Sequence, residues 1–204
     1  MTKVKICGIT NYEDAANAAI LGADFIGFNF YSLSPRFIDK DDAKIIIGKM
    51  PKNVKSVGVF VNEKEEEVKK TVKELNLDIV QLHGDETPDY CKKLKNAINK
   101  EIIKSFRIKR SIDMDTFKKY DGADYYLFDA FQEGLFGGTG KAFDWNLLKN
   151  IEKRFFLSGG LNCGNVSQAI KTAHPFAVDA ASGIEKNPRK KDIEKMKKFI
   201  EAAK

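Results

Sequence analysis

A cysteine and a glycine interrupt the first apolar run of the chain. Val4, Ile6 and Ile9 surround Cys7 and Gly8, and an acidic, alanine-rich helical pattern begins directly afterwards. A strand that ends in a thiol and passes at once into a helix places the thiol where enzymes built on parallel strands carry their chemistry. Cys7 is therefore a candidate reactive group, although most lone cysteines pack as small buried hydrophobes.

Lys5 precedes Cys7 by two residues, so both side chains lie on the same face of a strand. A nearby ammonium group lowers the pKa of a thiol and increases its thiolate fraction. An inward-facing lysine needs an acidic partner. Asp179, in the last apolar run of the chain, is the candidate.

Asp129 closes the apolar run 125–129. A carboxylate at such a position often only caps the following turn. Opposite a thiol, however, it supplies the second of the two groups that an isomerisation requires, one to give a proton and one to accept it. We predict that Cys7 and Asp129 form a catalytic pair.

Two short glycine-containing stretches, 157–161 and 181–185, follow the seventh and eighth apolar runs. Barrel enzymes commonly hold a phosphate group after these two strands, with backbone N–H groups as donors. The candidate phosphate ligands are Gly159, Gly160, Ser182 and Gly183.

Three further features are candidates for contact with a substrate. Arg36 follows Pro35 and is suited to bind a carboxylate through two parallel hydrogen bonds. His83 ends the fourth apolar run, either as a structural histidine or as one that contacts a ligand. The loop 130–142, which includes Gly138, is glycine-rich and is a candidate lid.

The remaining cysteines and the second histidine have no predicted chemical role. Cys91 and Cys163 fall in helix or loop positions and are interpreted as structural. His174 lies just before the eighth apolar run, and thus at the opposite end of the molecule from the other candidates.

Short apolar runs alternate with helical patterns along the whole chain, which predicts eight strand–helix units. The predicted strands are 4–9, 25–30, 56–61, 79–83, 101–106, 125–129, 155–158 and 177–181. The predicted helices are 12–21, 41–49, 65–75, 87–97, 112–119, 145–150, 165–172 and 190–203, the last with an apolar stripe of Ile193, Met196 and Ile200. This count predicts an α/β protein with a (β/α)₈ TIM barrel, with residues 1–204 forming a single domain.

The charge, hydropathy and cysteine content of the chain limit the classes of function that it could have. The chain has 204 residues, a net charge of +6 and a pI near 9.0, with lysines interspersed among glutamates rather than forming a basic stripe. This pattern argues against nucleic-acid binding and favours a small anionic substrate.

No apolar run is long enough for a membrane span and no secretory signal is visible, so no membrane partner is expected. Three widely spaced cysteines favour a reducing, cytoplasmic setting.

Ten short motifs, in order and at matching spacing, resemble the phosphoribosylanthranilate isomerase family. They are residues 5–10, 22–24, 27–28, 34–36, 57–62, 80–84, 137–141, 143–145, 157–162 and 177–179. The resemblance implies an Amadori rearrangement of N-(5-phosphoribosyl)anthranilate to 1-(2-carboxyphenylamino)-1-deoxyribulose 5-phosphate in tryptophan biosynthesis. It also implies that no metal and no organic cofactor is used, and it leaves open whether the protein is a monomer or a homodimer.

The resemblance assigns roles to several residues. It implies that Cys7 is the general base, that Asp129 is the general acid and that Arg36 contacts the anthranilate carboxylate. The chain departs from the family pattern at Ala181, where a serine is common. Two rival interpretations are a bifunctional isomerase, which would use an aspartate in place of Cys7, and a barrel that binds a phosphorylated ligand without turnover.

Overall fold

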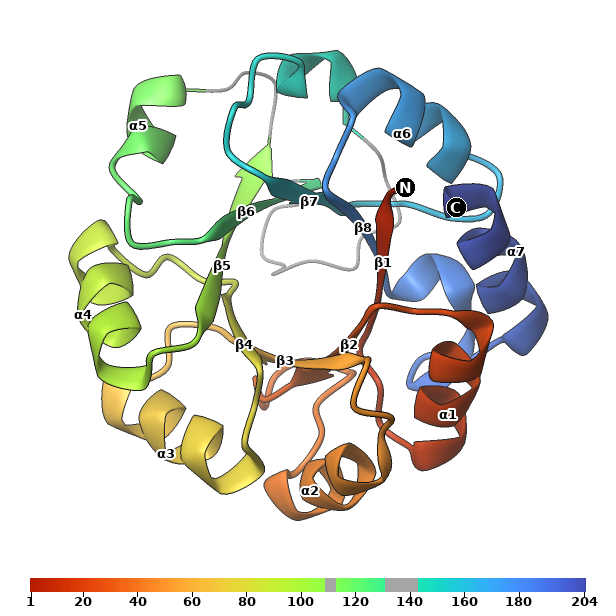
Figure 1. Cartoon of the computed structure of the whole chain (residues 1–204), viewed down its shortest axis with the longest axis horizontal. Coiled ribbons are helices and arrows are strands. Elements are labelled where there is room, and N and C mark those ends of the chain that lie inside the picture. The colour runs from red at the N-terminus through yellow and green to blue at the C-terminus, as the bar shows by residue number, and fades with distance from the viewer. Residues whose placement is uncertain (109–112, 131–142) are drawn as a thin grey trace.

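Eight parallel strands close into a barrel in the computed structural model, which describes residues 1–108, 113–130 and 143–204. Consecutive strands pair with one another, and β8 pairs with β1 to close the ring (Figure 1). The strands are β1 (Lys3–Cys7), β2 (Phe25–Asn29), β3 (Lys55–Phe60), β4 (Ile79–Leu82), β5 (Glu101–Ile108), β6 (Tyr125–Ala130), β7 (Phe155–Leu157) and β8 (Ala177–Ala180). The predicted (β/α)₈ fold is confirmed.

Helices surround the barrel on all sides in Figure 1. They are α1 (Tyr12–Leu21), α2 (Lys40–Lys49), α3 (Glu65–Leu75), α4 (Pro88–Ile98), α5 (Met114–Lys118), α6 (Val166–Ala173) and α7 (Ile193–Ala203), with the 3₁₀ helices η1 (Trp145–Leu148) and η2 (Ser182–Ile184). Within the described ranges, no helix has the length and apolar character that a membrane crossing requires.

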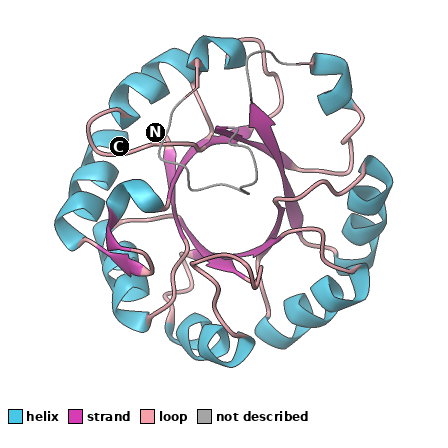
Figure 2. Cartoon of the chain, turned by 180° about the vertical axis from the view of Figure 1, so that it is seen from behind, coloured by secondary structure: helices cyan, strands magenta, loops and turns pink. Residues whose placement is uncertain are grey.

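Two predicted helices were wrong in part. The segment 145–150 forms only the 3₁₀ helix η1. The last helix begins at Ile193 rather than at residue 190, because the Asp192 side chain accepts hydrogen bonds from the first backbone N–H groups of the helix and so caps it there. Residues before this cap form a small antiparallel sheet of β9 (Glu185–Asn187) and β10 (Lys190–Lys191), which lies outside the barrel ring (Figure 2).

The apolar stripe of α7 also differs from the prediction. Met196 and Ile200 are buried as expected, but Ile193 is 48% exposed. Phe199, which is fully buried, takes part in the packing instead. The capped start of the helix places Ile193 at the first helical position, at the surface.

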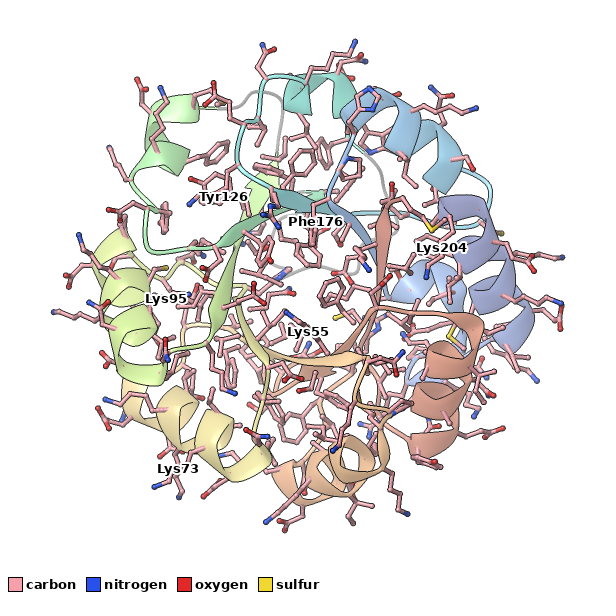
Figure 3. All side chains as sticks on the ribbon, in the orientation of Figure 1. Lys55, Lys73, Lys95, Tyr126, Phe176 and Lys204 are labelled. Carbon is pink, nitrogen blue, oxygen red and sulfur yellow. The ribbon has the colours of Figure 1, made fainter. Side chains whose placement is uncertain are left out.

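The barrel interior changes from apolar to polar along its axis. One end is filled by aromatic and aliphatic side chains, among them Phe176, which stacks on Tyr125 near the axis (Figure 3). Because side chains alternate along a strand, Ile79 and Gln81 share the inner face of β4, and Tyr125, Leu127 and Asp129 share that of β6. On the inner faces of β4 and β6, apolar side chains in the core are thus followed by polar ones at the C-terminal mouth.

A buried ion pair joins β5 to the loop after β4 on the outer side of the barrel. Lys104 of β5 lies 2.9 Å from a carboxylate oxygen of Glu86, and both residues are almost fully buried. Lys104 also donates to the carbonyl of Gly84, while Glu86 accepts from the backbone N–H groups of Asn62 and Gly84. The pair thus fixes the loops that follow β3 and β4.

Lys104→Met is expected to lower the free energy of unfolding by about 3–5 kcal/mol, because it leaves the buried Glu86 carboxylate without its cation. Urea titration followed by circular dichroism measures this loss. Lys93→Met, which removes a solvent-exposed pair with Asp89, is the matched control and is expected to leave the free energy of unfolding nearly unchanged. Equal stability of the two variants would contradict the role of the buried pair.

Candidate active site

A cavity of about 350 Å³ opens at the C-terminal mouth of the barrel. Its walls come from the ends of strands and from the loop after β2, and they combine polar and apolar side chains. The lining residues are Cys7, Gly8, Asn29, Tyr31, Leu33, Ser34, Pro35, Arg36, Val59, Val61, Gln81, His83, Asp129, Ser158, Asp179 and Ala181. Residues that are distant in the sequence, including Cys7 and Asp129, thus share one cavity.

Cys7 ends β1 opposite Gly27 of β2. A Cβ atom at position 27 would lie 2.8 Å from the Cys7 sulfur, so only glycine leaves room for the thiol in its present position. Gly8, with φ of 74°, then turns the chain away from the barrel. Its lack of a side chain lets the aliphatic part of Arg36 pack against the backbone there.

The expected pairing of Lys5 with Asp179 is present. Lys5 Nζ lies 3.0 Å from Asp179 Oδ2, and both side chains are buried next to Cys7. Burial alone would lower the pKa of Lys5, but the charges of Asp179 and Cys7 outweigh it and raise the pKa above its ordinary value. Lys5 is therefore a permanent cation below the thiol.

Two opposing effects act on the pKa of the Cys7 thiol. Burial raises the pKa of Cys7 above the ordinary value, and this effect exceeds the opposing attraction of Lys5 for the thiolate. The predicted effect of Lys5 is present, since its charge lowers the pKa of the thiol, but burial outweighs it and the net pKa is raised. The sequence of a strand shows which charged residues lie near the thiol, but it does not show how far the fold excludes water from the thiol.

Asp129 lies at the end of β6, where its Oδ1 accepts a hydrogen bond from the Ala130 backbone N–H. His83 Nε2 lies 3.4 Å from its Oδ2. The Gln81 amide nitrogen lies 2.8 Å from His83 Nδ1, and since an amide nitrogen only donates, Nδ1 accepts. In this arrangement a neutral His83 carries its proton on Nε2, facing Asp129 and the cavity.

Arg36 lines the cavity, and Glu185 holds one edge of its guanidinium group through two hydrogen bonds. The Ser34 hydroxyl accepts from the Arg36 backbone N–H and from the Asn29 side chain, which fixes the loop after β2. Glu185 was not a sequence candidate, although it ends one of the two glycine-containing stretches.

The loops after β7 and β8 meet beside this cavity. Gly159 and Gly160 have φ of 86° and 68°, in the region that favours glycine. A Cβ atom on Gly183 would collide with the Leu161 carbonyl, so the two loops touch backbone to backbone. These glycines and Ser182 are not cavity-lining themselves, but their neighbours Ser158 and Ala181 are.

Other predicted features fall outside this site. Gly138 and the candidate lid lie among residues 131–142, outside the described residues. Cys91 is fully buried in α4, as a structural cysteine is, whereas Cys163 is exposed and does not belong to the core. His174 ends α6 in a left-handed conformation, at the N-terminal end of the barrel.

Within residues 1–108, 113–130 and 143–204, no group of three or more His, Cys, Asp or Glu side chains is arranged to hold a metal ion. The chemistry that the described residues offer is proton transfer between a thiol, a carboxylate and an imidazole. An arginine and two glycine-containing loops beside them are suited to anions. This combination at the C-terminal mouth of a (β/α)₈ barrel is typical of enzymes that act on small anionic molecules.

Residues 4–202 match the family model described as N-(5'phosphoribosyl)anthranilate (PRA) isomerase, and the chain belongs to this family. A protein of Trichlorobacter lovleyi named N-(5'-phosphoribosyl)anthranilate isomerase is 44% identical over 207 residues, which cover 100% of this chain and 98% of the relative. The solved phosphoribosyl anthranilate isomerase of Thermotoga maritima is 41% identical, with a TM-score of 0.93 and coverage of 100% and 98%.

A further solved phosphoribosyl anthranilate isomerase is in complex with reduced 1-(o-carboxyphenylamino)-1-deoxyribulose 5-phosphate. It is 39% identical to this chain, with a TM-score of 0.89 and coverage of 100% and 98%. These likenesses extend over the full length of the barrel rather than over one motif.

Proposed function

We propose that this enzyme converts N-(5-phosphoribosyl)anthranilate to 1-(2-carboxyphenylamino)-1-deoxyribulose 5-phosphate, an Amadori rearrangement in tryptophan biosynthesis, with Cys7 and Asp129 as its acid–base pair. Family membership over residues 4–202 supports the reaction. The observation that carries the proposed mechanism is that the Cys7 thiol and the Asp129 carboxylate line the same cavity.

The reaction needs two proton transfers at different atoms. Asp129 protonates the furanose ring oxygen, the C1–O bond breaks, and the anilino nitrogen forms a Schiff base with C1. The Cys7 thiolate then removes the proton from C2, and the electron pair of the C–H bond moves to form an enolamine. Protonation at C1 and loss of the hydroxyl proton at C2 give the ketose, so the substrate and product are isomers.

The anionic groups of the substrate fit the two anion-binding regions of the site. Arg36 is suited to the anthranilate carboxylate because its guanidinium group lies beside the cavity. His83 and Asp179 also line the cavity, which supports a role for both in contacting the sugar hydroxyls. The proposed phosphate ligands are the backbone and side-chain groups of Gly138, Gly159, Gly160, Ser182 and Gly183.

We further propose that residues 1–204 act as one domain, as a monomer or a homodimer, in the cytoplasm. The partner is a phosphorylated small molecule, with no role for nucleic acid or a membrane surface. Three free thiols in the described part of the chain are consistent with a reducing compartment.

The raised pKa of Cys7 leads to a prediction on pH. Because the thiolate is the base and most of the thiol is protonated at neutral pH, kcat/KM is expected to keep rising with pH above 7. Steady-state rates between pH 6 and pH 9.5 measure this. Alkylation by iodoacetamide, resolved by peptide, provides a second readout, in which the labelling rate of Cys7 keeps rising with pH above 7. A kcat/KM that is level from pH 6.5 upward would contradict the raised pKa.

The proposed function is tested by the loss of anthranilate-type fluorescence when freshly prepared phosphoribosylanthranilate is mixed with catalytic amounts of the protein. EDTA in the assay removes adventitious metal ions. Rapid decay with many turnovers supports the isomerase. Tight binding of the reduced product analogue without any decay would show a barrel that binds the ligand and does not catalyse the reaction.

A further inference from the structure

Glu185 joins two cations beside the active-site cavity. It belongs to β9, in the small sheet that the sequence did not predict, and it is 8% exposed. Its carboxylate accepts hydrogen bonds from Arg36 Nε at 2.8 Å and Arg36 Nη2 at 2.7 Å. The same carboxylate accepts from Lys191 Nζ at 3.0 Å.

Lys191 is the less expected member of this cluster. Its side chain is fully buried, and its ammonium group also donates to the carbonyl of Ala181, a cavity-lining residue, at 3.1 Å. Its neighbour Lys190 is 44% exposed and pairs instead with Glu13 and Asp14. Burial lowers the pKa of Lys191 below its ordinary value, and the charge and hydrogen bond of Glu185 oppose this and favour the charged form.

The Glu185 carboxylate is ionised. Burial alone would raise its pKa, but the hydrogen bonds from Arg36 and the charge of Lys191 lower the pKa below its ordinary value. Two cations and one carboxylate therefore give the Arg36–Glu185–Lys191 cluster a net charge of about +1.

This charge decides what the cluster can bind. An arginine that is paired with a single carboxylate is neutralised and offers a second anion little net attraction. Lys191 offsets Glu185, so the positive charge of Arg36 remains available. Glu185 occupies the Nε–Nη2 edge of the guanidinium group, which leaves the Nη1–Nη2 edge for a second carboxylate in the same planar geometry.

We propose that Glu185 and Lys191 are positioning residues for carboxylate recognition: Glu185 fixes the orientation of Arg36, and Lys191 supplies the charge that lets Arg36 bind the aryl carboxylate of the substrate. This inference rests on the proposed function, because it takes the substrate to be an anthranilate derivative. The roles of both residues are exerted through Arg36 rather than by contact with the reacting atoms.

The test compares two ligands that differ only in the carboxylate. One is the reduced product analogue, and the other is the same compound made from aniline instead of anthranilate. Calorimetry measures the dissociation constants of both for the wild-type protein and the variants. Lys191→Met is expected to weaken binding of the carboxylated ligand by about tenfold or more, and binding of the other ligand by less than about twofold.

Three further variants complete the test. Lys191→Arg keeps the charge and is expected to restore most of the lost affinity. Lys190→Met removes a lysine of the neighbouring ion pairs and is the matched control, with both affinities unchanged. Glu185→Gln is expected to weaken binding of the carboxylated ligand although it adds positive charge, because it releases the guanidinium group. Tighter binding would overturn the positioning role of Glu185.

If Lys191→Met weakens the binding of both ligands equally, or weakens the binding of neither, the proposed role of Lys191 is overturned. If this variant does not fold, as judged by circular dichroism, Lys191→Gln replaces it, because its amide can still donate to the Ala181 carbonyl. The binding test does not depend on turnover. A wild-type protein that prefers the carboxylated ligand but does not isomerise phosphoribosylanthranilate would refute the proposed function and leave this inference standing.

Discussion

Cys7→Ser is expected to lower kcat/KM for phosphoribosylanthranilate by about 10²–10⁴-fold, the contribution of one general acid–base group. A serine hydroxyl is far less acidic than a thiol, so the variant has almost no base at neutral pH to remove the proton from C2. Gly27 already leaves room for the larger sulfur atom. The smaller oxygen therefore fits without displacing the strand, and the melting temperature should stay close to that of the wild type.

Cys163→Ser is the matched control for this prediction. Cys163 is an exposed free cysteine, so the same chemical change there should leave kcat/KM within about twofold of the wild-type value. Full activity of Cys7→Ser would contradict the assignment of Cys7 as the base. A parallel loss of activity in Cys163→Ser would indicate that the change acts on the protein as a whole.

Asp129→Asn is expected to have an effect of similar size on kcat, about 10²–10⁴-fold, for a different reason. The amide has nearly the same shape as the carboxyl group, but it cannot give a proton to the ring oxygen. The backbone hydrogen bond from Ala130 to Oδ1 can persist in the variant if the amide oxygen takes that position. We therefore expect the dissociation constant of the reduced product analogue, which has no ring to open, to change by only a few fold.

Asp121→Asn is the control for Asp129→Asn, since Asp121 is exposed and forms a surface ion pair with Lys92. Steady-state kinetics and calorimetry with the reduced product analogue separate turnover from binding in both variants. A loss of binding equal to the loss of kcat would show that Asp129 holds the ligand rather than transferring a proton.

The barrel could be predicted from the sequence because its strands are buried on both faces and therefore appear as short apolar runs. Because Cys7 lies at the end of such a run, it could also be placed at the C-terminal mouth of the barrel.

The β9–β10 sheet was missed because Lys190 and Lys191 look like the start of the basic helix that follows. The signals against this were Pro188, which lacks a backbone N–H, and Asp192, which is a good N-cap residue.

The active site was predictable only where its residues end strands. Cys7, Asp129 and His83 could be placed because every parallel strand of the barrel ends at the same mouth. Lys191 could not, because its partners Glu185 and Arg36 come together only through the fold. The net rise in the pKa of Cys7 was also beyond the sequence, since it depends on the burial of the thiol.

Isomerisation by proton removal from C2 can be followed directly by proton NMR of the product formed from phosphoribosylanthranilate in D₂O. We expect a ketose that has lost the C2 hydrogen and carries solvent-derived deuterium at C1. Cys7→Ser should give almost none of this product in the same time. Recovery of unreacted substrate from the wild-type reaction, or equal product from Cys7→Ser, would contradict removal of the C2 proton by Cys7.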